Sequence, residues 1–187
     1  MRTIVGYPIH KANSPKNTKK GDALLCLHIY TFKNRKGTIY IVNVEQYLYD
    51  VYIIKFHTKA DRSRKEKYNL LTNQKDARRI IYTCIEIGLQ IYVTNPNASF
   101  GFVGSPIPKE LKRESQLKNT KRFRVYSKFA KFFFSPDNFL HTNNPDFSLY
   151  LLLNKKHLES NNTLHEKIME MFEQHFDLSD LLGNTNN

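Results

Sequence analysis

Three runs of apolar, β-branched and aromatic residues follow one another between Leu24 and Thr58, and short polar segments separate them. Residues of these types are enriched in strands, and the first separating segment, 33–37, has the Asn and Gly that turns favour. Consecutive strands joined by short turns pair with each other as an antiparallel meander. We therefore predict three strands, over residues 24–32, 38–47 and 49–58.

The longest helical pattern comes next in the chain. Asn73 and Asp76 are residue types that begin helices, and Pro96 cannot continue one. Between them, apolar and small residues recur at a spacing of three to four, which is typical of one buried helix face. The sequence therefore predicts a helix over residues 75–93, with a stripe made of Ala77, Ile80, Ile81, Cys84, Gly88, Ile91 and Tyr92.

The remaining pattern predicts a short strand at 98–103, a helix from about residue 119 or 120 to 134, a strand at 147–153 and a helix at 163–176. Asp137 and Asp146 flank a turn-rich loop. The order is β-β-β-α-β-α-β-α, which predicts an α/β (α+β) fold with a mixed, mainly antiparallel sheet in a single domain. We expect residues 1–22 to be a basic flexible arm, 23–157 the core, and 158–187 an amphipathic helix with a frayed tail.

Charge is spread unevenly along the chain. The net charge of the whole chain is +12, and residues 155–187 contain three lysines and six acidic residues, which leaves +15 for residues 1–154. A field of that sign attracts polyanions. We therefore expect a nucleic acid or an acidic protein as partner. Two cysteines and the lack of a long apolar run indicate a cytoplasmic protein without a membrane span.

Two groups of basic residues are candidate anion sites. In the second long helix, Lys121, Arg124, Lys128 and Lys131 recur at helical spacing with Arg122 beside them, which is the pattern of one basic face. Arg78 and Arg79 lie near the start of the first long helix, where helix dipoles favour anions. Each group has an alternative interpretation as an ordinary solvated surface.

Familiar catalytic motifs are absent from the sequence. Gly104 is isolated, so neither a dinucleotide fingerprint nor a P-loop is present, and there is no Gly-x-Ser-x-Gly elbow. His28, His57 and His141 are acid–base candidates that stand apart from one another. The scattered histidines and the two cysteines have no metal-ligand spacing, so we expect no metal.

Several phrases of the sequence resemble uncharacterised bacterial protein families of unknown function, and this resemblance covers about residues 26–157. It implies no established activity. The phrases are Tyr68–Asn73, Asp76–Ile81, Asn95–Phe100, Asn119–Tyr126 and Phe147–Asn154.

The element order and the stretch Asn119–Tyr126 also resemble the GNAT family of N-acetyltransferases. This resemblance implies a GNAT-like fold, acetyl-coenzyme A as a cofactor, and Tyr126 as the proton donor to the departing thiolate. The family's pyrophosphate loop contains two glycines, whereas Thr72–Arg79 contains none. Side chains at those positions would block close approach of the backbone to phosphates, so no cofactor is expected.

The sequence leaves the function open. Its first interpretation is a basic, non-catalytic GNAT-like module that binds a polyanion or an acidic protein. The alternative is a divergent acyl-coenzyme A-dependent N-acyltransferase. In a third interpretation, the chain is an accessory protein, and the apolar face of its C-terminal helix docks on a partner. The alternative for that face is that it covers the chain's own sheet.

Overall fold

The computed structural model describes residues 5–12, 16–17, 23–64, 67–68, 76–103, 120–144 and 149–175. A single sheet runs through these residues in the order β1-β3-β4-β5-β6-β8-β7, and β2 also pairs with β3. Its strands are β1 (His10–Lys11), β2 (Lys16–Asn17), β3 (Leu24–Lys33), β4 (Ile39–Tyr47), β5 (Val51–Thr58), β6 (Ser99–Val103), β7 (Phe139–Asn144) and β8 (Leu149–Asn154).

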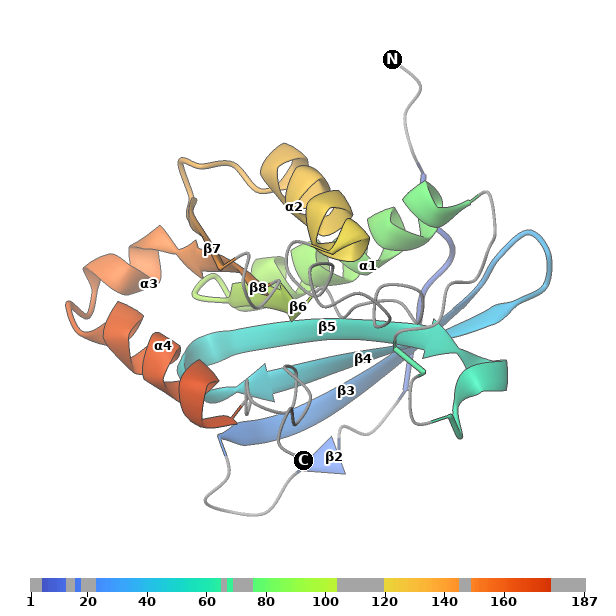
Figure 1. The fold of residues 1–187 in the computed structure, drawn as a ribbon, viewed down its shortest axis with the longest axis horizontal. Coiled ribbons are helices and arrows are strands. Elements are labelled where there is room, and N and C mark those ends of the chain that lie inside the picture. Colours follow the sequence, from blue (N-terminus) through green and yellow to red (C-terminus); the bar gives the residue numbers. More distant parts are fainter. Residues whose placement is uncertain are drawn as a thin grey trace, which may run out of the picture.

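Among the described strands, every pair is antiparallel except β5 with β6. That parallel pair is joined by a crossover through a helix, as parallel neighbours require. The helices are α1 (Ala77–Thr94), α2 (Lys121–Phe133), α3 (Lys155–Glu159) and α4 (Leu164–His175). The expected α+β fold with a mixed, mainly antiparallel sheet is therefore confirmed, and α1 and α2 lie on the same side of the strands (Figure 1).

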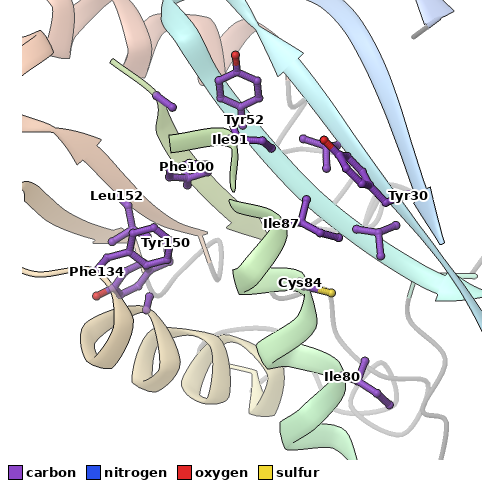
Figure 2. Close-up of a cluster of buried hydrophobic side chains, with 14 of the residues drawn as sticks. Tyr30, Tyr52, Ile80, Cys84, Ile87, Ile91, Phe100, Phe134, Tyr150 and Leu152 are labelled. Carbon is purple, nitrogen blue, oxygen red and sulfur yellow. The ribbon is translucent and has the colours of Figure 1, made fainter. Parts of the chain in front are cut away.

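Strand β8 shows how the core is divided between the two faces of the sheet. All six of its residues are buried. Tyr150 and Leu152 face α1 and α2, where Phe134 and Phe100 also pack (Figure 2). Leu149, Leu151 and Leu153 belong to a second cluster with α4. Because side chains alternate along a strand, a strand covered on both faces is apolar throughout.

The C-terminal helix covers its own sheet. Leu164, Ile168, Met171 and Phe172 of α4 are buried against Val51 and Ile53 of β5 and against β8. The apolar stripe of α4 is therefore used within the chain, and it is not a free docking surface for a partner.

Strand β7 and helix α3 were not expected from the sequence. Strand β7 lies in the segment interpreted as a turn-rich loop, and it pairs with β8 from Phe139↔Asn154 to Asn144↔Leu149. Asn143 and Asn144 at its end have weak strand propensity, so pairing with the neighbouring strand determines their conformation. The short helix α3 begins directly after β8, where the Asn154 side chain accepts a hydrogen bond from His157 N at 3.2 Å.

Part of the segment expected to be a flexible arm lies on the sheet. Strands β1 and β2 both pair with β3. Before them, Tyr7 is only 4% exposed, and its ring stacks on Phe32 at a centroid separation of 5.7 Å. The aromatic side chain of Tyr7 extends the core cluster that contains α1. Residues 1–4, 13–15 and 18–22 of the same segment lie outside the described residues.

Candidate functional site: helix α2 and the pocket beneath it

Helix α2 has a buried side and an exposed basic side. Thr120 caps its start by accepting a hydrogen bond from Phe123 N at 3.2 Å, and Pro136 follows its end. Phe123 and Ala130 are buried against the sheet. Three of the predicted anion-binding residues are exposed, and their spacing of four and three residues places them on one side of the helix: Arg124, Lys128 and Lys131.

An apolar pocket of about 70 Å³ lies between α1, α2, β5 and β6. The pairing of β5 with β6 runs from Val51↔Ser99 to Ile53↔Gly101, and the pocket lies past the last pair, where Ile54 of β5 and Phe102 of β6 line it. A space of this size holds a short acyl group but no large ligand. Its walls include Ile54, Phe56, Cys84, Phe102, Tyr126 and Phe129.

Tyr126 is the predicted proton donor, and α2 places it in the wall of this pocket. Its ring meets Phe102 edge-on at a centroid distance of 5.1 Å. On the other side, Phe102 stacks on Tyr150 at 5.2 Å with nearly parallel planes. The three rings form one aromatic group, which fixes the orientation of Tyr126.

Cys84 reaches the same pocket from α1. The residue is buried, and burial raises the pKa of its thiol well above the ordinary value. A thiol of that kind stays protonated at neutral pH and is a poor nucleophile.

His141 is engaged through both ring nitrogens. Nδ1 accepts a hydrogen bond from the Tyr150 hydroxyl at 2.9 Å, and Nε2 donates to the carbonyl oxygen of Phe134 at 3.0 Å. The carbonyl acceptor places a proton on Nε2, and burial lowers the pKa of His141, with Lys131 and Lys155 adding smaller repulsions. His141 therefore links β7 to β8 and to the end of α2.

We expect His141 to make stability depend on pH just below neutrality. Its folded-state pKa lies below the unfolded value near 6.5, so the unfolded chain binds the extra proton first as pH falls. The contribution of His141 to the free energy of unfolding is fully present above about pH 6.5. It is lost as the pH falls toward the folded-state pKa, with a limiting slope of about 1.4 kcal/mol per pH unit. Urea unfolding of the wild type and of His141→Asn between about pH 5 and 7.5 measures the effect. Equal slopes in the two proteins would assign the pH dependence to other groups.

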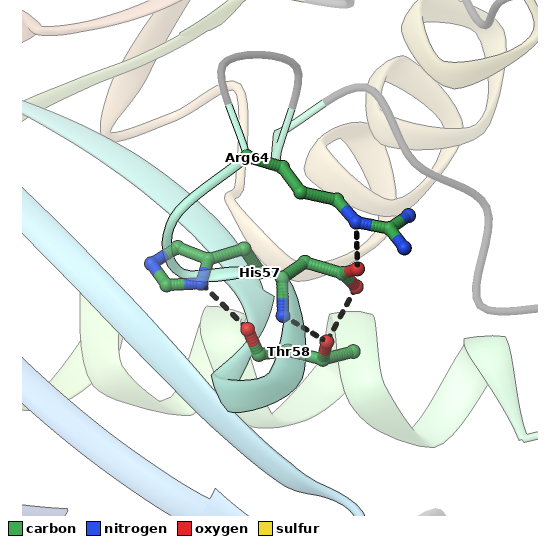
Figure 3. A network of polar contacts seen from close by, with 4 residues as sticks. His57, Thr58 and Arg64 are labelled. Carbon is green, nitrogen blue, oxygen red and sulfur yellow. Dashed lines mark hydrogen bonds and ion pairs between the residues drawn. The ribbon is translucent and has the colours of Figure 1, made fainter.

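His57 is also held by structural contacts. It is buried, and its Nδ1 donates to the Thr58 carbonyl oxygen at 2.8 Å (Figure 3). The Thr58 hydroxyl donates in turn to Asp61, whose carboxylate pairs with Arg64 Nε at 3.4 Å. This network lies at the end of β5, and it gives one nitrogen of the His57 ring a structural contact.

The start of α1 is occupied by the N-terminal segment. Arg79 Nη2 donates to the Gly6 carbonyl oxygen at 2.9 Å, and its guanidinium lies 4.1 Å from the centre of the Tyr7 ring. The Asp76 carboxylate accepts from the Tyr7 hydroxyl at 2.9 Å and from Asn34 Nδ2 at 3.1 Å. Arg79 thus has a structural role, and a carboxylate already lies where the helix dipole favours an anion.

No protein-family model, curated protein or solved structure matches this chain. Within the described part of the chain, no three His, Cys, Asp or Glu residues are placed to hold a metal ion. None of the helices described is long and apolar enough to cross a membrane.

The structure brings some of the predicted site residues together and separates others. Arg124, Lys128 and Lys131 share α2 with Tyr126, whereas Arg78 is exposed on α1 beside the engaged Arg79. The side chains of Lys121 and Arg122 lie outside the described residues. The sequence did not reveal the pocket, because its walls come from β5, α1, β6 and α2, which are separate segments of the chain.

Proposed function

We propose that this chain is a basic, non-catalytic module with a GNAT-like order of strands and helices, and that the exposed side of α2 binds a polyanion, with single-stranded nucleic acid as the partner class. The observation that carries the proposal is the exposure of Arg124, Lys128 and Lys131 on one side of α2 together with Phe132, which is 64% exposed.

The topology supports the GNAT-like part of the proposal. The sequential order β3-β4-β5-α1-β6-α2-β7-β8 contains the three-strand meander and the two crossover helices of that fold. Among the described strands the parallel pair is β5 with β6, and residues that follow its last paired positions line the pocket beneath α2.

The local chemistry supports a non-catalytic module. The Cys84 thiol is buried and protonated, and His57 and His141 are hydrogen-bonded to main-chain carbonyl groups. At the start of α1 the Asp76 carboxylate and Arg79 are tied to the N-terminal segment. These contacts give the two histidines and the start of α1 structural roles, whereas the cations of α2 stay exposed.

The exposed side of α2 combines the two features that single-stranded nucleic acids need. Cations follow the phosphate backbone, and an exposed ring stacks on a base. Phe132 follows Lys131 directly and lies one helical turn after Lys128, so ring and cations share one surface of α2.

Neutralising the α2 cations is expected to weaken binding at least tenfold. The variant Arg124→Gln/Lys128→Gln/Lys131→Gln removes three charges, and the slope of log K against log salt should fall by about two for a single strand. Fluorescence anisotropy with a labelled single-stranded RNA of about 20 nucleotides, titrated from about 50 mM salt, measures both quantities.

The matched control is Lys36→Gln/Lys59→Gln/Lys156→Gln, which removes the same charge from three exposed lysines outside α2. This control should retain most of the affinity. Equal losses in the two variants would show binding to the overall charge, and no binding by the wild type would overturn the nucleic-acid proposal. Poly-L-glutamate competing as well as RNA would favour an acidic protein partner.

The second candidate function is acyl transfer from an acyl-coenzyme A, and the presence of Tyr126 in the apolar pocket favours it. Thermal unfolding with and without acetyl-coenzyme A separates the two functions. Saturating ligand would raise the midpoint by roughly 5–10 °C, and Ala130→Leu, which fills the pocket, would abolish the rise. Our proposal expects no shift in either protein.

A further inference from the structure

Strand β7 is one edge of the sheet, and its outer side has no partner strand among the described residues. It is six residues long, and its pairing with β8 runs without a bulge from Phe139↔Asn154 to Asn144↔Leu149. A regular edge strand of this kind presents a row of main-chain N–H and C=O groups with which another strand can pair.

The opposite edge of the sheet has the features that prevent such pairing. Strands β1 and β2 are two residues long, each contains a lysine, and Pro8 lies just before β1. Short edge strands, lysine and proline are means by which natural sheets avoid edge-to-edge pairing. The six residues of β7 include no Lys, Arg, Asp, Glu or Pro. Strand β7 is therefore the unprotected edge of the described sheet.

The hydrogen-bond pattern identifies the main-chain groups of β7 that point outward. The Asn138 carbonyl oxygen accepts from Lys155 N at 3.0 Å, so the main chain of Asn138 points toward β8. Main-chain groups alternate in direction along an antiparallel strand, so Thr142 also points toward β8, and His141 and Asn143 point outward. Within the described part of the chain, the N–H and C=O groups of His141 and Asn143 form no hydrogen bond.

The side chains of β7 leave this edge accessible. Leu140 is 40% exposed, Asn143 is exposed and Thr142 is half-buried. The His141 ring is held toward β8 and the end of α2, because it bonds to the Tyr150 hydroxyl and to the carbonyl oxygen of Phe134. An approaching strand therefore meets neutral side chains and free main-chain groups.

We infer that two copies of this chain associate through β7, in antiparallel pairing about a two-fold axis at Thr142. Two-fold dimers that use the same surface on both subunits are the commonest oligomers. With the axis at Thr142, His141 of each copy lies opposite Asn143 of the other, and each such pair exchanges two hydrogen bonds between free groups. An axis at His141 would place Asn143 opposite Phe139, whose N–H already donates to the Ser135 carbonyl oxygen at 3.0 Å.

The geometry of this pairing has two consequences. The two Thr142 residues form a non-hydrogen-bonded pair, with their Cα atoms about 4.5 Å apart, and Thr–Thr pairs of this kind stabilise antiparallel strands. The axis is perpendicular to the sheet, so the α2 helices of both copies lie on the same side of the joined sheet (Figure 1). The interface is small, so we expect a weak dimer. This inference does not rest on binding of a polyanion.

Cysteine cross-linking tests the register of the dimer. A Cα separation of about 4.5 Å is within the range of disulfides, so mild oxidation should convert Thr142→Cys to a covalent dimer, seen on a non-reducing gel. Leu140→Cys is the matched control, because its two copies would be roughly 13 Å apart. Leu140 is also the more exposed position, so random collisions would favour the control. Cys26 and Cys84 are buried, and the wild type should not cross-link.

Sedimentation equilibrium of the wild type over about 10–500 µM measures the association itself. Asn143→Pro removes an outward N–H and no bond to β8, so it should raise the dissociation constant at least tenfold and leave the chain folded by circular dichroism. Asn143→Ala keeps that N–H and should associate like the wild type. The inference is overturned if the wild type stays monomeric at every concentration, if Thr142→Cys cross-links no faster than Leu140→Cys, or if Asn143→Pro associates like the wild type.

Discussion

Gly101→Leu is expected to abolish cooperative folding of this chain. Gly101 lies on β6 at the centre of the sheet, beneath α4. A Cβ atom added there would lie 2.7 Å from Ile53 Cδ1 and 2.9 Å from Leu151 Cδ2, with Phe172 Cζ at 3.5 Å. Two of these distances are far shorter than van der Waals contact, so even one methyl group requires the packed side chains to move.

The expected cost grows with the size of the new side chain. Overpacking a core usually costs about 1–3 kcal/mol, and we expect Gly101→Ala to lie in that range. Leucine adds three more carbon atoms to the same space, so we expect Gly101→Leu to lose more than about 4 kcal/mol. The free energy of unfolding of a native domain is only about 5–15 kcal/mol, so such a loss approaches the whole of it. Chemical denaturation followed by circular dichroism measures both variants.

Gly88→Ala is the matched control for this prediction. Gly88 is also buried, but the atoms nearest to an added Cβ would be Ile54 Cδ1 at 3.3 Å and two ring atoms at 3.7 Å. Alanine is favoured over glycine in a helix by about 1 kcal/mol, which offsets the crowding. We expect a change within about 1 kcal/mol. If Gly101→Leu unfolded at the same denaturant concentration as the wild type, the packing of α4 over β6 would be wrong.

Tyr7→Ala is expected to cost about 3–5 kcal/mol, as truncation of a buried aromatic residue usually does. The Tyr7 ring is 4% exposed and is packed between Phe32 and the Arg79 guanidinium. Its hydroxyl also donates to Asp76 at the start of α1. Thermal unfolding should show a midpoint lower by roughly 10 °C, because each kcal/mol corresponds to about 2–4 °C at this chain length.

Tyr7→Phe separates the ring from the hydroxyl. It keeps the stacking and removes one hydrogen bond to a carboxylate, so we expect a loss of about 2 kcal/mol. If Tyr7→Ala left the midpoint unchanged, the segment around Tyr7 would be detached from the core in solution, and the interpretation of residues 1–22 as a flexible arm would hold. A large loss would establish β1 and its preceding residues as part of the core.

Sequence periodicity located the elements whose signal is local. The apolar stripe from Ala77 to Tyr92 predicted α1 to within two residues at its start and one at its end, and the three β-rich runs predicted β3, β4 and β5. The basic spacing in α2 also placed Arg124, Lys128 and Lys131 on one side. These patterns depend on residues within one or two turns of each other, so the sequence alone contains them.

The tertiary structure decided the features that depend on distant residues. Strand β7 exists because β8 offers it a pairing edge, although its own Asn-rich end has little strand propensity. Arg79 was a candidate anion ligand until the fold placed Gly6 and Tyr7 against it, 73 and 72 positions earlier in the chain. The pocket beneath α2 likewise forms between segments that are remote in sequence. Hydrophobic periodicity specifies which face of each element is buried, but it does not specify which other element covers that face, and the contacts that create a site depend on that pairing.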